Sequence, residues 1–197
     1  MREAVDVHVY FNFRSPYCYL VSKTMWPIFD DFHANLIWHP VGGWDLRSPP
    51  DRVKKKLPIA RQDMARFAKR LGISVNPPPM ETEPTPAGAA SLYAEKQGKL
   101  REYIVETMRE EWENGMNIAS DEALMNVAQR IGLDPEAILA ASKSEANLAI
   151  LKQNAEEADD NGVIGVPTFR IGEEIFWGQD RVEFVIERLM ELRARKV

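Results

Sequence analysis

A strand that runs directly into a helix is the feature that most limits how this chain can fold. Apolar and polar side chains alternate over residues 5–13, which is the two-residue period of a β-strand. Ser15 and Pro16 follow, and both residue types favour the first turn of a helix. Helical spacing then continues to about Phe32, and residues 34–40 predict a second strand. This β-α-β unit favours parallel strands joined by a right-handed crossover.

The rest of the chain of 197 residues is mainly helical until its last part. Apolar residues three to four apart predict helices near 59–71, 87–97, 99–114, 120–131, 134–141 and 144–160. A hairpin is predicted at 167–177, and a last helix at 180–193. Strands at both ends with helices between them predict a single sheet interrupted by an insertion.

Charge and hydropathy exclude several classes of partner. The formal net charge is −5, and Lys54-Lys55-Lys56 is the only run of cations, which is too short for a phosphate-tracking stripe. We therefore expect no nucleic-acid partner. The N-terminal residues lack a secretory apolar core, and no apolar run reaches the length of a membrane span. These observations predict a cytoplasmic protein without a membrane partner.

Cys18 is the only cysteine, so neither an intrachain disulfide nor a CxxC pair is possible. It lies one helical turn after Ser15, where unpaired N–H groups favour a nearby anion. At this turn the hydroxyl of Ser15 could bind an anionic sulfur, or the thiol of Cys18 could become one. No metal-binding motif is present, and neither His8 nor His39 has a carboxylate at a recognisable spacing. We expect these two to be ordinary structural histidines and predict no metal.

Two motifs resemble a known family. Residues 13–20 (Phe-Arg-Ser-Pro-Tyr-Cys-Tyr-Leu) are similar to the F-x-S-P-Y/F-x-Y-L signature of 2-hydroxychromene-2-carboxylate isomerases and kappa-class glutathione transferases. Residues 162–169 and 176–181 resemble their second signature, G-V-x-G-V-P-T-F followed by F-W-G-Q-D-R. The resemblance implies an α/β fold: a thioredoxin-like domain of the DsbA/kappa type (residues 1–45 and 145–197) with an inserted all-helical domain (46–144). It also implies a homodimer.

The resemblance further implies a glutathione site. Ser15 falls on the active-site serine, whose hydroxyl donates to the glutathione sulfur. Val166 and a cis Pro167 would pair with the cysteinyl backbone, and Gln179 and Asp180 would hold the γ-glutamyl end. Lys56 would pair with a glutathione carboxylate.

Each of these residues also has a purely structural interpretation. Ser15 is a preferred helix N-cap, and the two roles are compatible. Pro167 could simply start an edge strand. Asp180 could cap the last helix, with Glu183 completing a capping box. Lys56, in an uncertain register with Lys54 and Lys55, could belong to a solvated helix face.

The implied activity is that of a glutathione-dependent cis-trans isomerase acting on a small aromatic hydroxy-acid or enone substrate in aromatic catabolism. The alternatives are a kappa-like glutathione transferase, a monothiol redox protein that uses Cys18, and a binding module without turnover. Cys18 occupies the second-cysteine place of a CxxC motif, whereas the attacking cysteine of such motifs is the first. We therefore expect Cys18 to be a small buried side chain.

Overall fold

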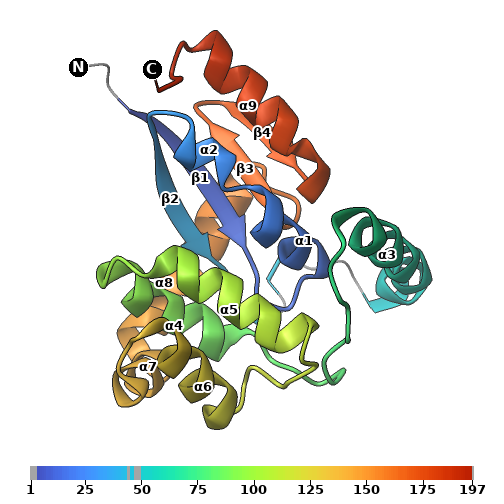
Figure 1. Ribbon diagram of the computed structural model, residues 1–197, viewed down its shortest axis with the longest axis vertical. Coiled ribbons are helices and arrows are strands. Elements are labelled where there is room, and N and C mark those ends of the chain that lie inside the picture. Colours follow the sequence, from blue (N-terminus) through green and yellow to red (C-terminus); the bar gives the residue numbers. More distant parts are fainter. Residues whose placement is uncertain (1–3, 44, 47–49, 197) are drawn as a thin grey trace.

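The structure is a computed structural model that describes residues 4–43, 45–46 and 50–196. One four-stranded sheet runs through it in the order β2-β1-β3-β4 (Figure 1). Strands β1 (Val5–Phe11) and β2 (Ala34–Pro40) are parallel. Strand β3 (Thr168–Ile171) is antiparallel to β1, and β4 (Glu174–Trp177) is antiparallel to β3. The predicted single sheet, with its parallel first pair and its late hairpin, is confirmed.

The crossover between β1 and β2 contains two helices, where the sequence predicted one. Helix α1 (Pro16–Thr24) ends early, and the short helix α2 (Pro27–Asp30) follows. The expectation of one helix up to Phe32 is wrong because Pro27 has no N–H to donate and its ring clashes with the preceding turn. In Figure 1, α2 lies beside α9 (Val182–Glu191), near the end of the molecule where both termini lie.

Helices fill the chain between β2 and β3. They are α3 (Pro50–Leu71), α4 (Thr85–Lys96), α5 (Leu100–Trp112), α6 (Asp121–Ile131), α7 (Pro135–Ser142) and α8 (Glu145–Asp160). Helix α3 begins before the predicted residue 59 and continues through Pro58, with Pro50 at its start. It packs against α1 and stands away from α4–α7 (Figure 1).

The two faces of the sheet are covered differently. Val7, Val9 and Phe11 of β1 are fully buried in the main core, which also includes side chains from α1, α4, α5 and α9. Tyr10 points to the opposite face and forms a small second cluster with Ala158 of α8 and with Val163. Helix α8 therefore covers the face of the sheet opposite α1. The division into the two predicted domains stays a prediction, and the main core contains residues of both.

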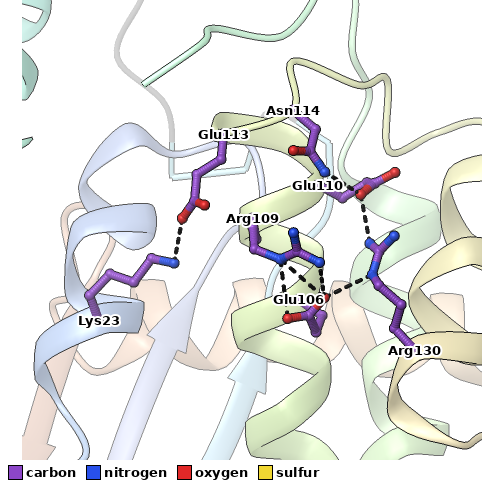
Figure 2. A network of polar contacts seen from close by, with 7 residues as sticks. All are labelled: Lys23, Glu106, Arg109, Glu110, Glu113, Asn114 and Arg130. Carbon is purple, nitrogen blue, oxygen red and sulfur yellow. Dashed lines mark hydrogen bonds and ion pairs between the residues drawn. The ribbon is translucent and has the colours of Figure 1, made fainter. Parts of the chain in front are cut away.

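Ion pairs fasten the inserted helices to one another (Figure 2). Arg130 of α6 binds Glu106 at 2.8 Å and Glu110 at 2.6 Å, and both acids lie on α5. Lys23, in the last turn of α1, binds Glu113 just after α5 at 2.6 Å. These contacts tie α5 to α6 on one side and to α1 on the other. Among the described helices, none is both long and apolar enough to cross a membrane.

Candidate active site

The turn between β1 and α1 is fixed by Asn12, whose side chain is buried. Its Oδ1 accepts the backbone N–H of Arg14 at 2.8 Å, and its backbone oxygen accepts the N–H of Ser15 at 3.1 Å. Its Nδ2 donates to the backbone oxygen of Val41 at 3.2 Å, which ties the turn to the end of β2. Asparagine favours such turns because its side chain bonds to the backbone two residues on. The turn therefore holds Ser15 in place at the start of α1.

Ser15 is the N-cap of α1, as the structural interpretation predicted. Its Oγ accepts the backbone N–H of Cys18 at 3.2 Å, and Pro16 occupies the first helical position. Within the described part of the chain, the hydroxyl hydrogen of Ser15 has only the sulfur of Cys18, a weak acceptor, to donate to. The first turn contains no acidic residue, so no side chain there offsets the partial positive charge of the helix end. The half-buried hydroxyl can therefore cap the helix and also donate to an anion.

Cys18 is fully buried inside the first turn of α1. Burial raises the pKa of its thiol to about 12, although contacts with Asn12 and Ser15 act in the opposite direction. The thiolate is the reactive form of cysteine, so at neutral pH this sulfur is neither charged nor accessible. The prediction of a small buried side chain agrees with this placement.

Val166 and Pro167 lie at the same edge of the sheet as Ser15. Thr168 is paired with Tyr10, so the residues just before it lie beside the end of β1, where the turn to α1 begins. The Val166–Pro167 peptide bond is cis, as the resemblance implied. Val166 is half-buried, and neither its N–H nor its C=O has a hydrogen-bond partner among the described residues. Such groups can pair with an extended peptide.

Gln179 and Asp180 are held near this edge, because the N–H of Gly178 donates to the backbone oxygen of Pro167 at 2.9 Å. They lie in the short helix η1 (Gln179–Arg181), which packs against α1. Gln179 is buried, yet its side-chain amide has no hydrogen-bond partner in the described ranges. Asp180 is half exposed, and its Oδ2 binds Arg181 at 2.7 Å.

The capping role considered for Asp180 is wrong. Helix α9 begins at Val182, its N-cap position is Arg181, and no side chain caps it. The physical reason is the extra turn η1, which separates Asp180 from the helix and leaves its carboxylate to pair with the neighbouring guanidinium.

Tyr17 connects α1 to α3. Its hydroxyl donates to Oδ2 of Asp63 at 3.1 Å. Burial raises the pKa of Tyr17 to about 12, helped by Asp63 and by the negative charge of Asp180. Asp180 is thus near enough to Tyr17 to act on it, and Asp63 is in direct contact with it. The sequence contained no local signal for Asp63, because the pair is 46 residues apart.

Lys56 lies on α3 with an exposed side chain. It precedes Asp63 by seven residues, or about two helical turns, so it shares the face of α3 that carries Asp63. Lys54 falls on the opposite face, nine residues before Asp63, and Lys55 falls to one side. Of the three lysines, Lys56 is therefore the one on the face of α3 that contacts Tyr17. It lies about 10 Å along the helix from that contact.

A groove of about 770 Å³ lies elsewhere, between α5 and α6. It is lined by charged side chains that bind one another, including Glu106, Arg109 and Arg130 (Figure 2). Ligand sites are mostly apolar with a few convergent polar groups, so this groove is a poor candidate. The edge of the sheet that carries Ser15 remains the better one.

Comparison with known proteins identifies the family of this chain. The model of the DsbA-like thioredoxin domain matches residues 6–190. This chain belongs to the DsbA-like thioredoxin family. The match covers both the residues around the sheet and the inserted helices, so the implied α/β thioredoxin-like fold is confirmed.

Relatives of this DsbA-like protein carry several names. It is 23% identical over 198 residues to a 2-hydroxychromene-2-carboxylate isomerase of Sphingobium xenophagum, covering 97% of this chain and all of the relative. It is 24% identical over 205 residues to glutathione S-transferase kappa 1 of Caenorhabditis elegans, covering 94% of this chain and 91% of the relative.

Solved structures show the same fold. A 2-hydroxychromene-2-carboxylate isomerase superposes with a TM-score of 0.82 at 23% identity, over 95% of this chain and 96% of the other. The cytosolic disulfide reductase DsbM of Pseudomonas aeruginosa, solved with GSH, superposes with a TM-score of 0.68 at 19% identity, over 96% of this chain and all of the other. These named relatives are enzymes.

Sequence reasoning missed one buried acid near the active-site turn of this DsbA-like chain. Glu111 of α5 is fully buried, and neither carboxylate oxygen has a hydrogen-bond partner among the described residues. The nearest described cation is Nε of Arg14, 4.0 Å from Oε1. Burial raises the pKa of Glu111 well above its usual range, and Arg14 offsets only part of this effect. The acid therefore holds its proton more tightly in the folded protein than in the unfolded chain.

Replacing Glu111 with glutamine is expected to stabilise this DsbA-like protein at pH 8. A raised pKa means that the unfolded state loses the proton first, so the wild-type stability falls as pH rises above the unfolded value of about 4.3. Glu111→Gln removes this penalty, which we expect to be about 1–3 kcal/mol at pH 8 and close to zero at pH 4. Urea denaturation at a series of pH values measures the difference.

The matched control is Glu102→Gln, on the same helix. Glu102 is exposed and pairs with Lys99, so its replacement should change stability by less than about 1 kcal/mol. A loss of stability in Glu111→Gln at pH 8, with the wild-type pH dependence retained, would show that Glu111 is a favourable charged partner of Arg14.

Proposed function

We propose that this protein is a glutathione-dependent cis-trans isomerase of the 2-hydroxychromene-2-carboxylate type. Its substrate would be a small aromatic hydroxy-acid or enone. The homodimer, the cytoplasmic location and the role in aromatic catabolism that the resemblance implies stay predictions.

One observation carries the proposal: a serine stands at the N-terminus of α1, where among the described residues its hydroxyl has only the weakly accepting sulfur of Cys18 to donate to. The single thiol of the chain is buried one turn further on, with its pKa raised to about 12. A reaction that needs a sulfur anion at this helix end must therefore take the sulfur from a ligand. A donor and a helix N-terminus both favour the charged form of such a sulfur.

The residues around Ser15 fit a tripeptide thiol. The unpaired N–H and C=O of Val166 would bind the cysteinyl backbone as an added strand does. The unpartnered amide of Gln179 and the carboxylate of Asp180 would hold the γ-glutamyl end, where a carboxylate suits the ammonium group. Lys56 would attract a glutathione carboxylate from the same side of α3 as Asp63.

Bound glutathione would supply a thiolate that adds to a conjugated double bond and later leaves, so that the bond can rotate in between. Ser15 would donate its hydroxyl hydrogen to the sulfur and lower the energy of its charged form. Val166, Gln179 and Asp180 would fix the tripeptide so that the sulfur stays beside Ser15.

A kappa-like glutathione transferase is the second candidate, because the kappa-class relative covers most of the chain. A redox function of Cys18 is less favoured, because its thiol is buried and neutral. The experiment is to incubate the protein with glutathione and 2-hydroxychromene-2-carboxylate and to follow both by mass spectrometry. An isomerase changes the substrate without consuming glutathione, whereas a transferase consumes one glutathione for each product. If the substrate does not react, the proposal is overturned.

Replacing Asp180 with asparagine should weaken glutathione binding by about tenfold, because the ammonium loses a charge-assisted partner that is half exposed. The rate at saturating glutathione should stay the same, since this end of the tripeptide is remote from the sulfur. Calorimetric titration and initial rates measure the two effects. Glu173→Gln, in the exposed turn between β3 and β4, is the control that should change neither. A lower saturated rate with unchanged binding would contradict this role.

A further inference from the structure

Two histidines and one glutamate meet on the face of the sheet opposite α1. His8 of β1 and His39 of β2 lie diagonally on neighbouring strands, with Nδ1 of His8 2.8 Å from Nε2 of His39. Oε2 of Glu157, on α8, lies 3.9 Å from Nδ1 of His39. The sequence showed no carboxylate at a recognisable spacing from either histidine. The reason is distance in the sequence, because Glu157 comes from a helix more than a hundred residues after His39.

This cluster contains a buried atom that lacks a partner. His39 is only 7% exposed, and its Nδ1 has no hydrogen bond in the described part of the chain. The nearby carboxylate is too far away for a hydrogen bond to it. Buried polar atoms without partners are uncommon in folded proteins and call for an explanation such as an ion. One ligand atom from each of the three residues lies within 4.8 Å of the other two.

The charges around the cluster suit a cation. The guanidinium of Arg170 is the positive group that acts on both histidines. Glu157 contributes one negative charge, and Asp6 is near enough to act on His8. The two carboxylates outweigh the single guanidinium.

We propose that His8, His39 and Glu157 form a binding site for a divalent transition-metal ion of the Zn²⁺ class. Two imidazoles and one carboxylate suit Zn²⁺, Co²⁺ or Ni²⁺, whereas Mg²⁺ and Ca²⁺ prefer sites made of oxygen. Two nitrogens on one tetrahedral Zn²⁺ lie about 3.3 Å apart. Nδ1 of His39 and Oε2 of Glu157, now 3.9 Å apart, must then approach by about 0.6 Å, and the contact between Nε2 of His39 and Nδ1 of His8 must open so that His8 can turn toward the ion. The side chain of Glu157 is 38% exposed, so an ion can enter from solvent.

The site would fasten α8 to the sheet. His8 and His39 belong to β1 and β2, and Glu157 is the only ligand from α8. A contact already present nearby is the hydrogen bond from Asn154 of α8 to the backbone oxygen of Pro40 at 2.9 Å. The ring of Tyr10 stacks on His39 with centroids 4.6 Å apart. An ion that binds only the folded state therefore stabilises this attachment.

The test is to titrate the whole protein, first freed of metal with a chelator, with Zn²⁺ by calorimetry and with Co²⁺ by visible absorption. We expect one ion per chain, and a Co²⁺ spectrum of the intense type given by tetrahedral ligands. Glu157→Gln and His8→Gln should each weaken Zn²⁺ binding at least tenfold. The melting temperature should rise with Zn²⁺ in the wild type and less in these variants.

Two control variants separate this site from incidental binding. Glu156→Gln replaces an exposed neighbour on α8, and His33→Gln replaces the one histidine outside the cluster. Both should bind Zn²⁺ as the wild type does. The proposal is overturned if the wild type shows no saturable binding at millimolar Zn²⁺. It is also overturned if Glu157→Gln and His8→Gln leave the binding unchanged. Because the readouts are metal binding and melting temperature, the proposal stands or falls independently of the isomerase activity.

Discussion

Replacing Ser15 with alanine is expected to lower the turnover at saturating glutathione by about 10²- to 10³-fold. The hydroxyl is the donor that stabilises the charged sulfur in our account, and removing one preorganised donor typically has an effect of this size. The variant also loses the cap of α1, which costs about 1 kcal/mol of stability. Initial rates and urea denaturation measure the two effects separately.

The chain offers a matched control for the capping effect. Ser120 caps α6, and its Oγ accepts the N–H of Ala123 at 3.2 Å, the same distance as in the Ser15 cap. Ser120→Ala should lose a similar amount of stability and keep full turnover. If Ser15→Ala also keeps full turnover, the serine is only a cap and the catalytic assignment fails.

Replacing Phe13 with alanine should destabilise the protein by about 3–5 kcal/mol, the usual cost of truncating a buried aromatic side chain. Phe13 is fully buried just before the active-site turn. Its ring lies 6.2 Å from that of Trp38 on β2 and 5.8 Å from that of Tyr103 on α5. It therefore joins the sheet to the inserted helices. Urea denaturation followed by both tryptophan fluorescence and far-ultraviolet circular dichroism measures the loss.

We propose that the thioredoxin-like part and the inserted helices unfold together, because this contact belongs to one core that contains residues of both. Both probes should then report the same transition in the wild type and in Phe13→Ala. Phe184→Ala is the control, since this ring is half exposed on α9 and its loss should cost less than about 1 kcal/mol. Two separate transitions, or a small effect of Phe13→Ala, would contradict a shared core.

The local parts of the fold could be predicted from the sequence. The alternation before Ser15 and the Ser-Pro pair determine a strand, a turn and a helix start by rules that act over a few residues. Proline was harder to interpret, because its effect depends on position. Pro27 divides the crossover helix, whereas Pro58 is accommodated inside α3. Pattern alone does not distinguish a proline that ends a helix from one that a solvated helix tolerates.

The contacts that complete the site could not be predicted, because they join residues far apart in the sequence. Tyr17 pairs with Asp63, and Arg14 lies beside Glu111. The burial of Glu111 could not be predicted from its residue type either, since a glutamate in a helix is expected to be exposed. Lys56 could be favoured over its neighbours only once the contact of Asp63 fixed the orientation of α3.

The most direct test of our central claim is a crystal structure of the protein with bound glutathione. We predict that the glutathione sulfur lies within about 3.5 Å of Oγ of Ser15. The cysteinyl backbone should pair with Val166, and the γ-glutamyl end should lie at Gln179 and Asp180. A mixed disulfide with Cys18, or glutathione bound away from the start of α1, would contradict the account.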